Sequence, residues 1–146
     1  MFDDLYNTDI LTLSASLKNE QLDNPDGTAR NVSKLCGSWL EIDVNIDGDV
    51  VGECALRVQA CALGQSSAAI LKEGIVGATL EEITEARDIL RLMLKEGGKS
   101  PKGRFEKLFL LQGVSEYPAR HTSTMLAFDA AVDAVSQALK LSLIHI

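Results

Sequence analysis

Hydrophobic and polar residues alternate over residues 39–46 with the two-residue period of a β-strand. One side of this strand carries acidic and amide residues, and the other carries Leu40, Ile42, Val44 and Ile46. Asp47-Gly48 is a favoured two-residue hairpin turn, and residues 49–58 return as the partner strand. The pattern predicts an antiparallel hairpin with one buried face.

Helical spacing of apolar residues predicts four helices. The third has the clearest boundaries, because Thr79 and Glu82 form a capping-box pattern and Gly97-Gly98 follows the last apolar residue. The last helix is expected to begin near Thr122 or Ser123, either of which is a good N-cap. The expected helices span residues 2–18, 64–73, 79–96 and about 122–139.

Three segments are less regular. Residues 105–111 fit either a helix or an extended strand, and residues 113–121 read as a loop. A third strand would come from residues 55–59 or 30–35. Together these elements predict an α+β fold in a single domain, residues 1–146, with a small antiparallel sheet packed against several helices.

The hairpin is expected to bring two cysteines together. Cys36 precedes its first strand and Cys61 follows its second, so antiparallel pairing places both at one end of the sheet although 25 residues separate them. Cys61 also stands where a strand passes into a helix, and the free N–H groups of a helix start favour a thiolate. The alternative is that both are packing residues. Cys54, inside the second strand, is assigned to packing alone.

Composition narrows the function. The net charge of −7 argues against broad contact with nucleic acid or an anionic membrane surface, and no apolar run is long enough to span a bilayer. The acidic start Phe2-Asp3-Asp4 does not resemble a secretion signal, so a cytoplasmic location is expected. Three cysteines in such a chain favour free thiols or a metal site over disulfides.

The ordered set of motifs resembles the IscU/NifU/SufU family of iron–sulfur cluster scaffolds. The resemblance extends from about Leu5 to Leu139 and depends on several motifs in sequence. These are Cys36-Gly37, the hairpin Asp47-Gly48-Asp49-Val50-Val51, Cys61 with Ser66, Ala68 and Ala69 after it, and Gly113-Val114-Ser115-Glu116-Tyr117-Pro118-Ala119-Arg120, which looks like the loop before the third cysteine of SufU-type proteins.

The resemblance implies a metal-binding site with two departures from the family pattern. Cys36 and Cys61 match ligand positions, but Ser38 stands where the family has aspartate and Ser123 where it has the third cysteine. His121 is the candidate further ligand, through a neutral imidazole nitrogen. Serine is a poor substitute for a thiolate, so a cluster could instead bridge two protomers that each give Cys36 and Cys61.

Three functions are compatible with these residues. The first is a non-enzymatic scaffold or carrier that holds a transient iron–sulfur cluster, either as a single chain or as a homodimer. By resemblance, its partners would be a cysteine desulfurase, chaperones and apo iron–sulfur proteins. The second is a zinc-binding sulfur acceptor of the SufU type. The third is an adaptor that keeps the fold and the partner surface but builds no cluster.

Overall fold

The computed structural model describes residues 5–34 and 37–144, with side chains described up to residue 140. Its helices are α2 (Thr8–Ser16), α3 (Ala62–Ile75), α4 (Leu80–Glu96) and α5 (His121–Ile144), with 3₁₀ segments η1 (Gly103–Glu116) and η2 (Pro118–Arg120) between α4 and α5. Its strands are β1 (Gly27–Val32), β2 (Trp39–Asp47) and β3 (Val50–Gln59).

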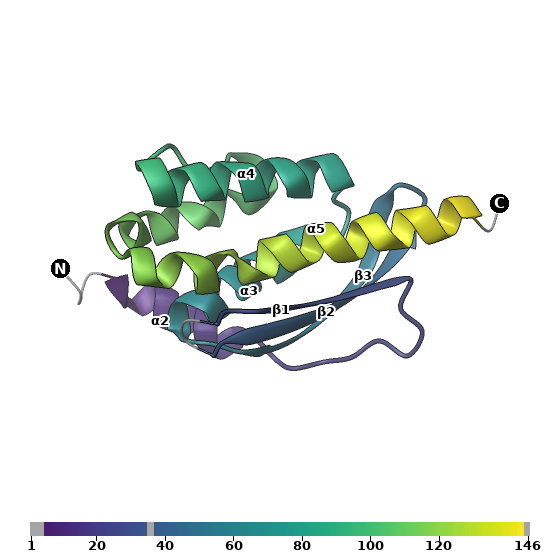
Figure 1. Cartoon of the computed structure of the whole chain (residues 1–146), viewed down its shortest axis with the longest axis horizontal. Coiled ribbons are helices and arrows are strands. Elements are labelled where there is room, and N and C mark those ends of the chain that lie inside the picture. The colour runs from purple at the N-terminus through teal and green to yellow at the C-terminus, as the bar shows by residue number, and fades with distance from the viewer. Residues whose placement is uncertain (1–4, 35–36, 145–146) are drawn as a thin grey trace.

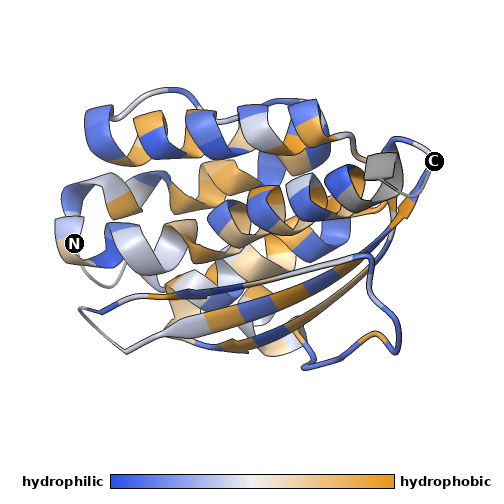
Figure 2. Ribbon diagram, turned by 45° about the vertical axis from the view of Figure 1, so that its right-hand side comes forward, coloured by the Kyte–Doolittle hydropathy of each residue, from blue (hydrophilic) through white to orange (hydrophobic). Residues whose placement is uncertain are grey.

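The three strands form one antiparallel sheet in the order β1-β2-β3. Helices α3 and α5 pack on one face of this sheet and α4 lies beyond them (Figure 1), while α2 packs against α3. Apolar residues line the space between the sheet and the helices (Figure 2). The predicted α+β architecture is confirmed.

The predicted hairpin is present, with its turn one residue later than expected. Asp47 pairs with Val50, so Gly48 and Asp49 form the turn, and Gly48 has the positive φ of 68° that glycine tolerates. A bulge at Gly52 shifts the register beyond Asn45. The alternating sequence pattern does not predict this bulge. It does predict the buried face of β2 correctly: Leu40, Ile42 and Val44 are all almost fully buried.

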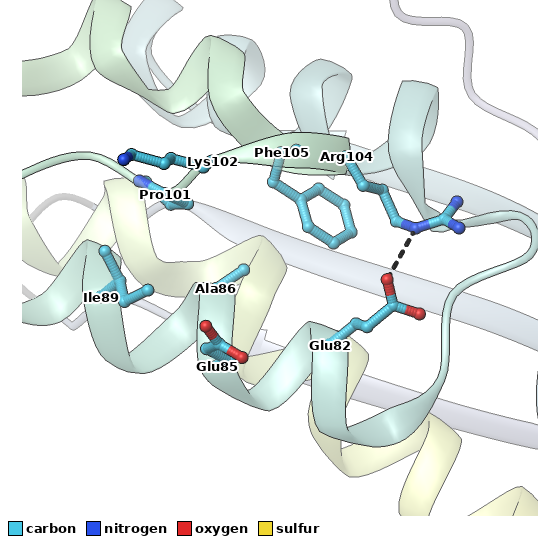
Figure 3. A pocket seen from close by; sticks show the side chains of 9 residues that line it. Glu82, Glu85, Ala86, Ile89, Pro101, Lys102, Arg104 and Phe105 are labelled. Atoms are coloured by element: carbon cyan, nitrogen blue, oxygen red, sulfur yellow. Dashed lines mark hydrogen bonds and ion pairs between the residues drawn. The ribbon is translucent and has the colours of Figure 1, made fainter.

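The capping box of α4 is confirmed. Thr79 Oγ1 accepts a hydrogen bond from the Glu82 backbone, the Glu82 carboxylate accepts one from the Thr79 backbone, and Gly97 ends the helix in the left-handed conformation. The Arg104 guanidinium then pairs with the Glu82 carboxylate at 3.2 Å (Figure 3) and donates to the carbonyl of Gly74 at the end of α3. Arg104 therefore fastens the connection between α3 and α4.

Other boundaries differ from the prediction. The first helix is shorter, because α2 covers only residues 8–16, and the third strand is β1, which begins earlier than either candidate segment. Residues 103–116 and 118–120 are 3₁₀ structure, which corrects the loop expected at residues 113–121. Helix α5 begins at His121, so the prediction that Thr122 or Ser123 caps it is wrong: both lie inside its first turn.

The segment before β1 crosses the sheet face opposite the helices and protects its outer edge. The backbone N–H of Glu20 in this segment donates to the carbonyl of Leu56 on β3, and the Lys72 ammonium, from α3, donates to the carbonyl of Cys54 on the same strand. The N–H of Leu22 donates to the Asp43 carboxylate on β2. The bonds to the Leu56 and Cys54 carbonyls occupy groups that the edge strand β3 would otherwise offer to another chain. The Leu22 bond instead ties the segment to a side chain of the central strand.

Candidate functional site

Cys61 lies at the junction of β3 and α3, as the sequence predicted. Strand β3 ends at Gln59, and Cys61 is the N-cap residue of α3, with extended backbone dihedrals. Its side chain makes no capping hydrogen bond to the helix, while its carbonyl accepts the N–H of Gln65 at 2.9 Å. The half-buried sulfur is therefore left for contacts outside its own helix.

Ser123 provides that contact. Its hydroxyl oxygen lies 3.5 Å from Cys61 Sγ and 3.4 Å from the carbonyl oxygen of Arg120. Ser123 is 1% exposed, so the pair faces inward from the starts of α3 and α5. Ser123, which the resemblance aligns with the family's third cysteine, is thus next to Cys61 in space.

The loop that carries Cys36 begins beside the same junction. Trp39 at the start of β2 pairs with Gln59 at the end of β3, so residue 38 lies next to the chain that enters Cys61. The loop is closed by two hydrogen bonds, from Ser33 N–H to the Ser38 carbonyl at 2.8 Å and from Gly37 N–H to the Ser33 carbonyl at 2.9 Å. Cys36 lies outside the described residues, and its proximity to Cys61 stays a prediction.

His121 makes its described contacts away from Cys61. Its Nε2 atom lies 3.0 Å from the carbonyl oxygen of Val114, and its ring helps to line a groove between α4 and α5 with Arg91 and Asp129. Successive helix residues turn by about 100°, so positions 121 and 123 are on different faces of α5. A metal-binding role for His121 stays a prediction, and in this conformation the ring points toward α4.

The same groove contains a perturbed carboxyl group. Burial raises the pKa of Asp129, and the positive charge of Arg91 partly offsets that effect. The Arg91 and Asp129 side chains form an ion pair at 3.2 Å, which joins α4 to α5 in the groove that His121 also lines. This pair stabilises the helix packing rather than adding a donor to the cysteine site.

The donor set is incomplete within the part of the chain that the structure describes. There, no three His, Cys, Asp or Glu side chains come together as a possible metal site. Cys61 gives one soft thiol and Ser123 one neutral hydroxyl, which alone do not fit zinc or iron. Cys54 adds nothing, because it is buried in the core and burial raises the pKa of its thiol to about 12.

Sequence reasoning missed how the small residues after Cys61 act. Ser66 and Ser67 are fully buried, and their hydroxyls donate to backbone carbonyls of neighbouring helices, at Ile10 and Thr124 respectively. Sequence alone indicated only close packing at these positions. The available signal was two polar residues among alanines on a buried helix, since buried hydroxyls nearly always find a hydrogen-bond partner.

This geometry can be compared with known proteins. The NifU-like N terminal domain model matches residues 6–124. The chain belongs to this family of iron–sulfur cluster assembly scaffolds. The matched range includes the whole sheet, α3, α4 and both residues of the Cys61–Ser123 pair. Within the described residues, none of the helices is long and apolar enough to cross a membrane.

Three relatives show how similar the chain is to other proteins of this family. The chain is 41% identical to the N-terminal part of a NifU-like protein from Brucella abortus, with a TM-score of 0.92 over 95% of this chain and 97% of that structure. It is 24% identical to an IscU scaffold from Thermotoga maritima, over 94% of this chain and 96% of the relative. It is 23% identical to the zinc-dependent sulfurtransferase SufU of Bacillus subtilis, over 92% of both chains.

Proposed function

We propose that this NifU-like N-terminal domain is an iron–sulfur cluster assembly scaffold or carrier whose cargo is held by Cys36 and Cys61. Residues 1–146 act in this role as one domain. The cluster is cargo, received and then passed on, so the protein is not an enzyme in the strict sense. Its sulfur comes from a cysteine desulfurase, and its product goes to apo iron–sulfur proteins.

The observation that best supports this proposal is the contact between Cys61 and Ser123. It brings a thiol next to Ser123, the residue that by resemblance aligns with the family's third cysteine, at the sheet end where the segment after Cys36 enters β2. In two chains, Cys36 and Cys61 supply four thiolates, which is a complete ligand count for a [2Fe–2S] cluster. A cluster bridging two protomers therefore needs no thiolate at position 123.

Anaerobic reconstitution tests the proposal. The full chain is incubated with ferric iron and sulfide, so that assembly of a diferric cluster needs no added oxidant, and bound iron, acid-labile sulfide and visible absorption are measured after desalting. We expect a coloured dimer, with loss of colour and of bound iron on Cys36→Ala or Cys61→Ala. The matched control is Cys54→Ala, which removes a thiol outside the site and should keep the colour. A colourless, iron-free wild-type chain would refute the proposal.

One observation favours a second candidate. Ser123 places a hydroxyl beside Cys61, and a neutral hydroxyl is a weak ligand for iron. A chain that binds assembly partners without building a cluster would tolerate this. Wild-type protein that binds a cysteine desulfurase but retains neither iron nor zinc would favour such an adaptor. Stoichiometric zinc with no colour would instead favour sulfur transfer of the kind named for the Bacillus subtilis relative.

A further inference from the structure

The first turn of α3 packs unusually closely on the start of α5. A Cβ atom added to Gly64 would lie 2.9 Å from Ala60 Cβ and 3.2 Å from the carbonyl oxygen of Ser123. The first distance is shorter than real Cβ contacts, and the second requires its neighbour to move by a few tenths of an ångström. At Gly64, therefore, the first turn of α3 has no room for a side chain between Ala60 and the Ser123 carbonyl.

A hydrogen bond fixes the same contact one turn further on. The fully buried Ser67 hydroxyl donates to the carbonyl oxygen of Thr124 at 2.7 Å, next in sequence to Ser123. On the other side of α3, the Ser66 hydroxyl donates to the carbonyl of Ile10 in α2 at 2.8 Å. The segment after Cys61 is thus held against α5 by direct backbone contact and against α2 by a buried hydrogen bond.

We infer that Gly64 and Ser67 are positioning residues that set the separation of Cys61 from residue 123. Cys61 caps the helix in which Gly64 lies three residues later, so the two move together as one rigid turn. A methyl group at Gly64 pushes Ala60 and Ser123 outward, which are the residues beside and opposite Cys61. The inference rests on the proposed function only in taking Cys61 and position 123 as the site.

Helix propensity argues against a simpler role for Gly64. Glycine inside a helix is less favourable than alanine, because its backbone loses more freedom on folding. Gly64 is buried in α3 and does not have a positive φ that would require glycine. The feature of this position that does require glycine is the lack of room for a Cβ atom between Ala60 and the Ser123 carbonyl.

A pair of thiols at positions 61 and 123 can be used to measure how close these two positions lie. In the full-length chain carrying Cys36→Ser and Ser123→Cys, the thiols at positions 61 and 123 are equilibrated with reduced and oxidised glutathione. Forming the protein disulfide releases two protons and two electrons, which reduce one glutathione disulfide to two thiols. The reaction is stopped with acid, and mass spectrometry gives the fraction of protein with the disulfide. This fraction gives the effective concentration with which the two thiols meet.

We expect Gly64→Ala in this background to lower the effective concentration by about tenfold or more, because disulfide formation demands a narrow range of Cβ separations. Ser67→Ala, which removes a buried hydrogen bond but adds no bulk, should lower it by about threefold. The matched control is Gly98→Ala, where the added Cβ would make only ordinary contacts at 3.6 Å, and it should leave the value unchanged.

Circular dichroism and the urea midpoint are measured on the same samples, so that a change in thiol geometry is separated from a change in folding. The inference is overturned if folded Gly64→Ala keeps the effective concentration within about twofold of its parent. If Gly64→Ala does not fold, the inference is overturned when folded Ser67→Ala keeps the effective concentration within about twofold of its parent. The assay contains no iron or sulfide, so a chain that fails to bind a cluster can still support or overturn this inference.

Discussion

The ion pair between Asp43 and Arg57 gives a sharp prediction for stability. Asp43 is 3% exposed, and its carboxylate accepts hydrogen bonds from two Arg57 guanidinium nitrogens, both at 3.0 Å. It also accepts the N–H of Leu22 at 3.1 Å, which ties the segment before β1 to the sheet. Arg57 contacts Glu41 and the Glu20 carbonyl as well. Asp43→Asn removes the charge but keeps the shape.

The expected loss in the free energy of unfolding at pH 7 is about 2–3 kcal/mol. Breaking a buried ion pair outright costs about 3–5 kcal/mol, because one charge is left unpaired. The loss here is smaller for two reasons: the asparagine oxygen can still accept one bond, and Arg57 keeps Glu41 as a partner. Urea unfolding followed by circular dichroism measures the difference.

The pH dependence tests the cause. Burial opposes ionisation of Asp43, but the hydrogen bonds from Arg57 and Leu22 and the charge of Arg57 outweigh it, so the pKa of Asp43 lies below its ordinary value. A group with a lowered pKa in the folded state stabilises the protein fully above its unfolded pKa, about 3.9 for Asp. That contribution is lost as the pH falls through the folded pKa.

We therefore expect the gap between wild type and Asp43→Asn to stay constant above about pH 5 and to narrow below about pH 4. The matched control is Glu53→Gln, an exposed carboxylate on the same hairpin, which should change stability by less than about 0.5 kcal/mol. A gap under about 0.5 kcal/mol at pH 7 would contradict the reasoning, and so would a gap that does not narrow in acid.

Three further predictions concern the core, a helix end and a thiol. Gly74→Ala would place a Cβ 2.6 Å from the Arg104 carbonyl oxygen and 2.9 Å from the Phe105 ring, so urea unfolding should show a loss of about 1–3 kcal/mol. Thr79→Ala removes half of the α4 capping box and should cost about 1 kcal/mol in the same assay. Cys54, with its thiol pKa raised to about 12, should react with iodoacetamide at pH 8 about three orders of magnitude more slowly than an ordinary thiol.

Each of these has a distinct control or contrary result. Gly113→Ala, whose Cβ would meet only Leu5 Cδ1 at 3.5 Å, should stay near wild type while Gly74→Ala does not. Glu82→Gln should be milder than Thr79→Ala, since glutamine can still accept the backbone N–H. Rapid alkylation of Cys54 in the folded protein would mean that β3 opens from the core.

Much of the fold could be predicted from local sequence. The alternation of Leu40, Ile42 and Val44 identified the buried face of β2, and Thr79 with Glu82 fixed the start of α4, because both signals act within a few residues. The bulge at Gly52 could not be predicted in this way, since a glycine in a strand does not by itself specify where the register shifts. The start of α5 was predicted too late because the 3₁₀ turn at residues 118–120 continues directly into the helix at His121, ahead of the residues expected to cap it.

The site was partly predictable for the same reason. That Cys61 follows a strand and starts a helix is a local pattern, and the structure confirms it. The approach of Ser123 to within 3.5 Å of Cys61 joins the starts of two helices through residues 62 positions apart in sequence, and it became an expectation only through the family resemblance. The sequence signals that the buried hydroxyls of Ser66 and Ser67 need hydrogen-bond partners, but it does not specify the partners, because these are tertiary contacts.

The central claim is that the thiols of Cys36 and Cys61 share one pocket. Reaction of the reduced, metal-free chain with phenylarsine oxide tests it most directly, because one trivalent arsenic binds two neighbouring thiolates. Mass spectrometry should show one arsenic per chain bridging the peptides that contain Cys36 and Cys61, and Cys54→Ala should leave the bridge intact. Independent alkylation of both cysteines, with no arsenic bridge between them, would contradict the account.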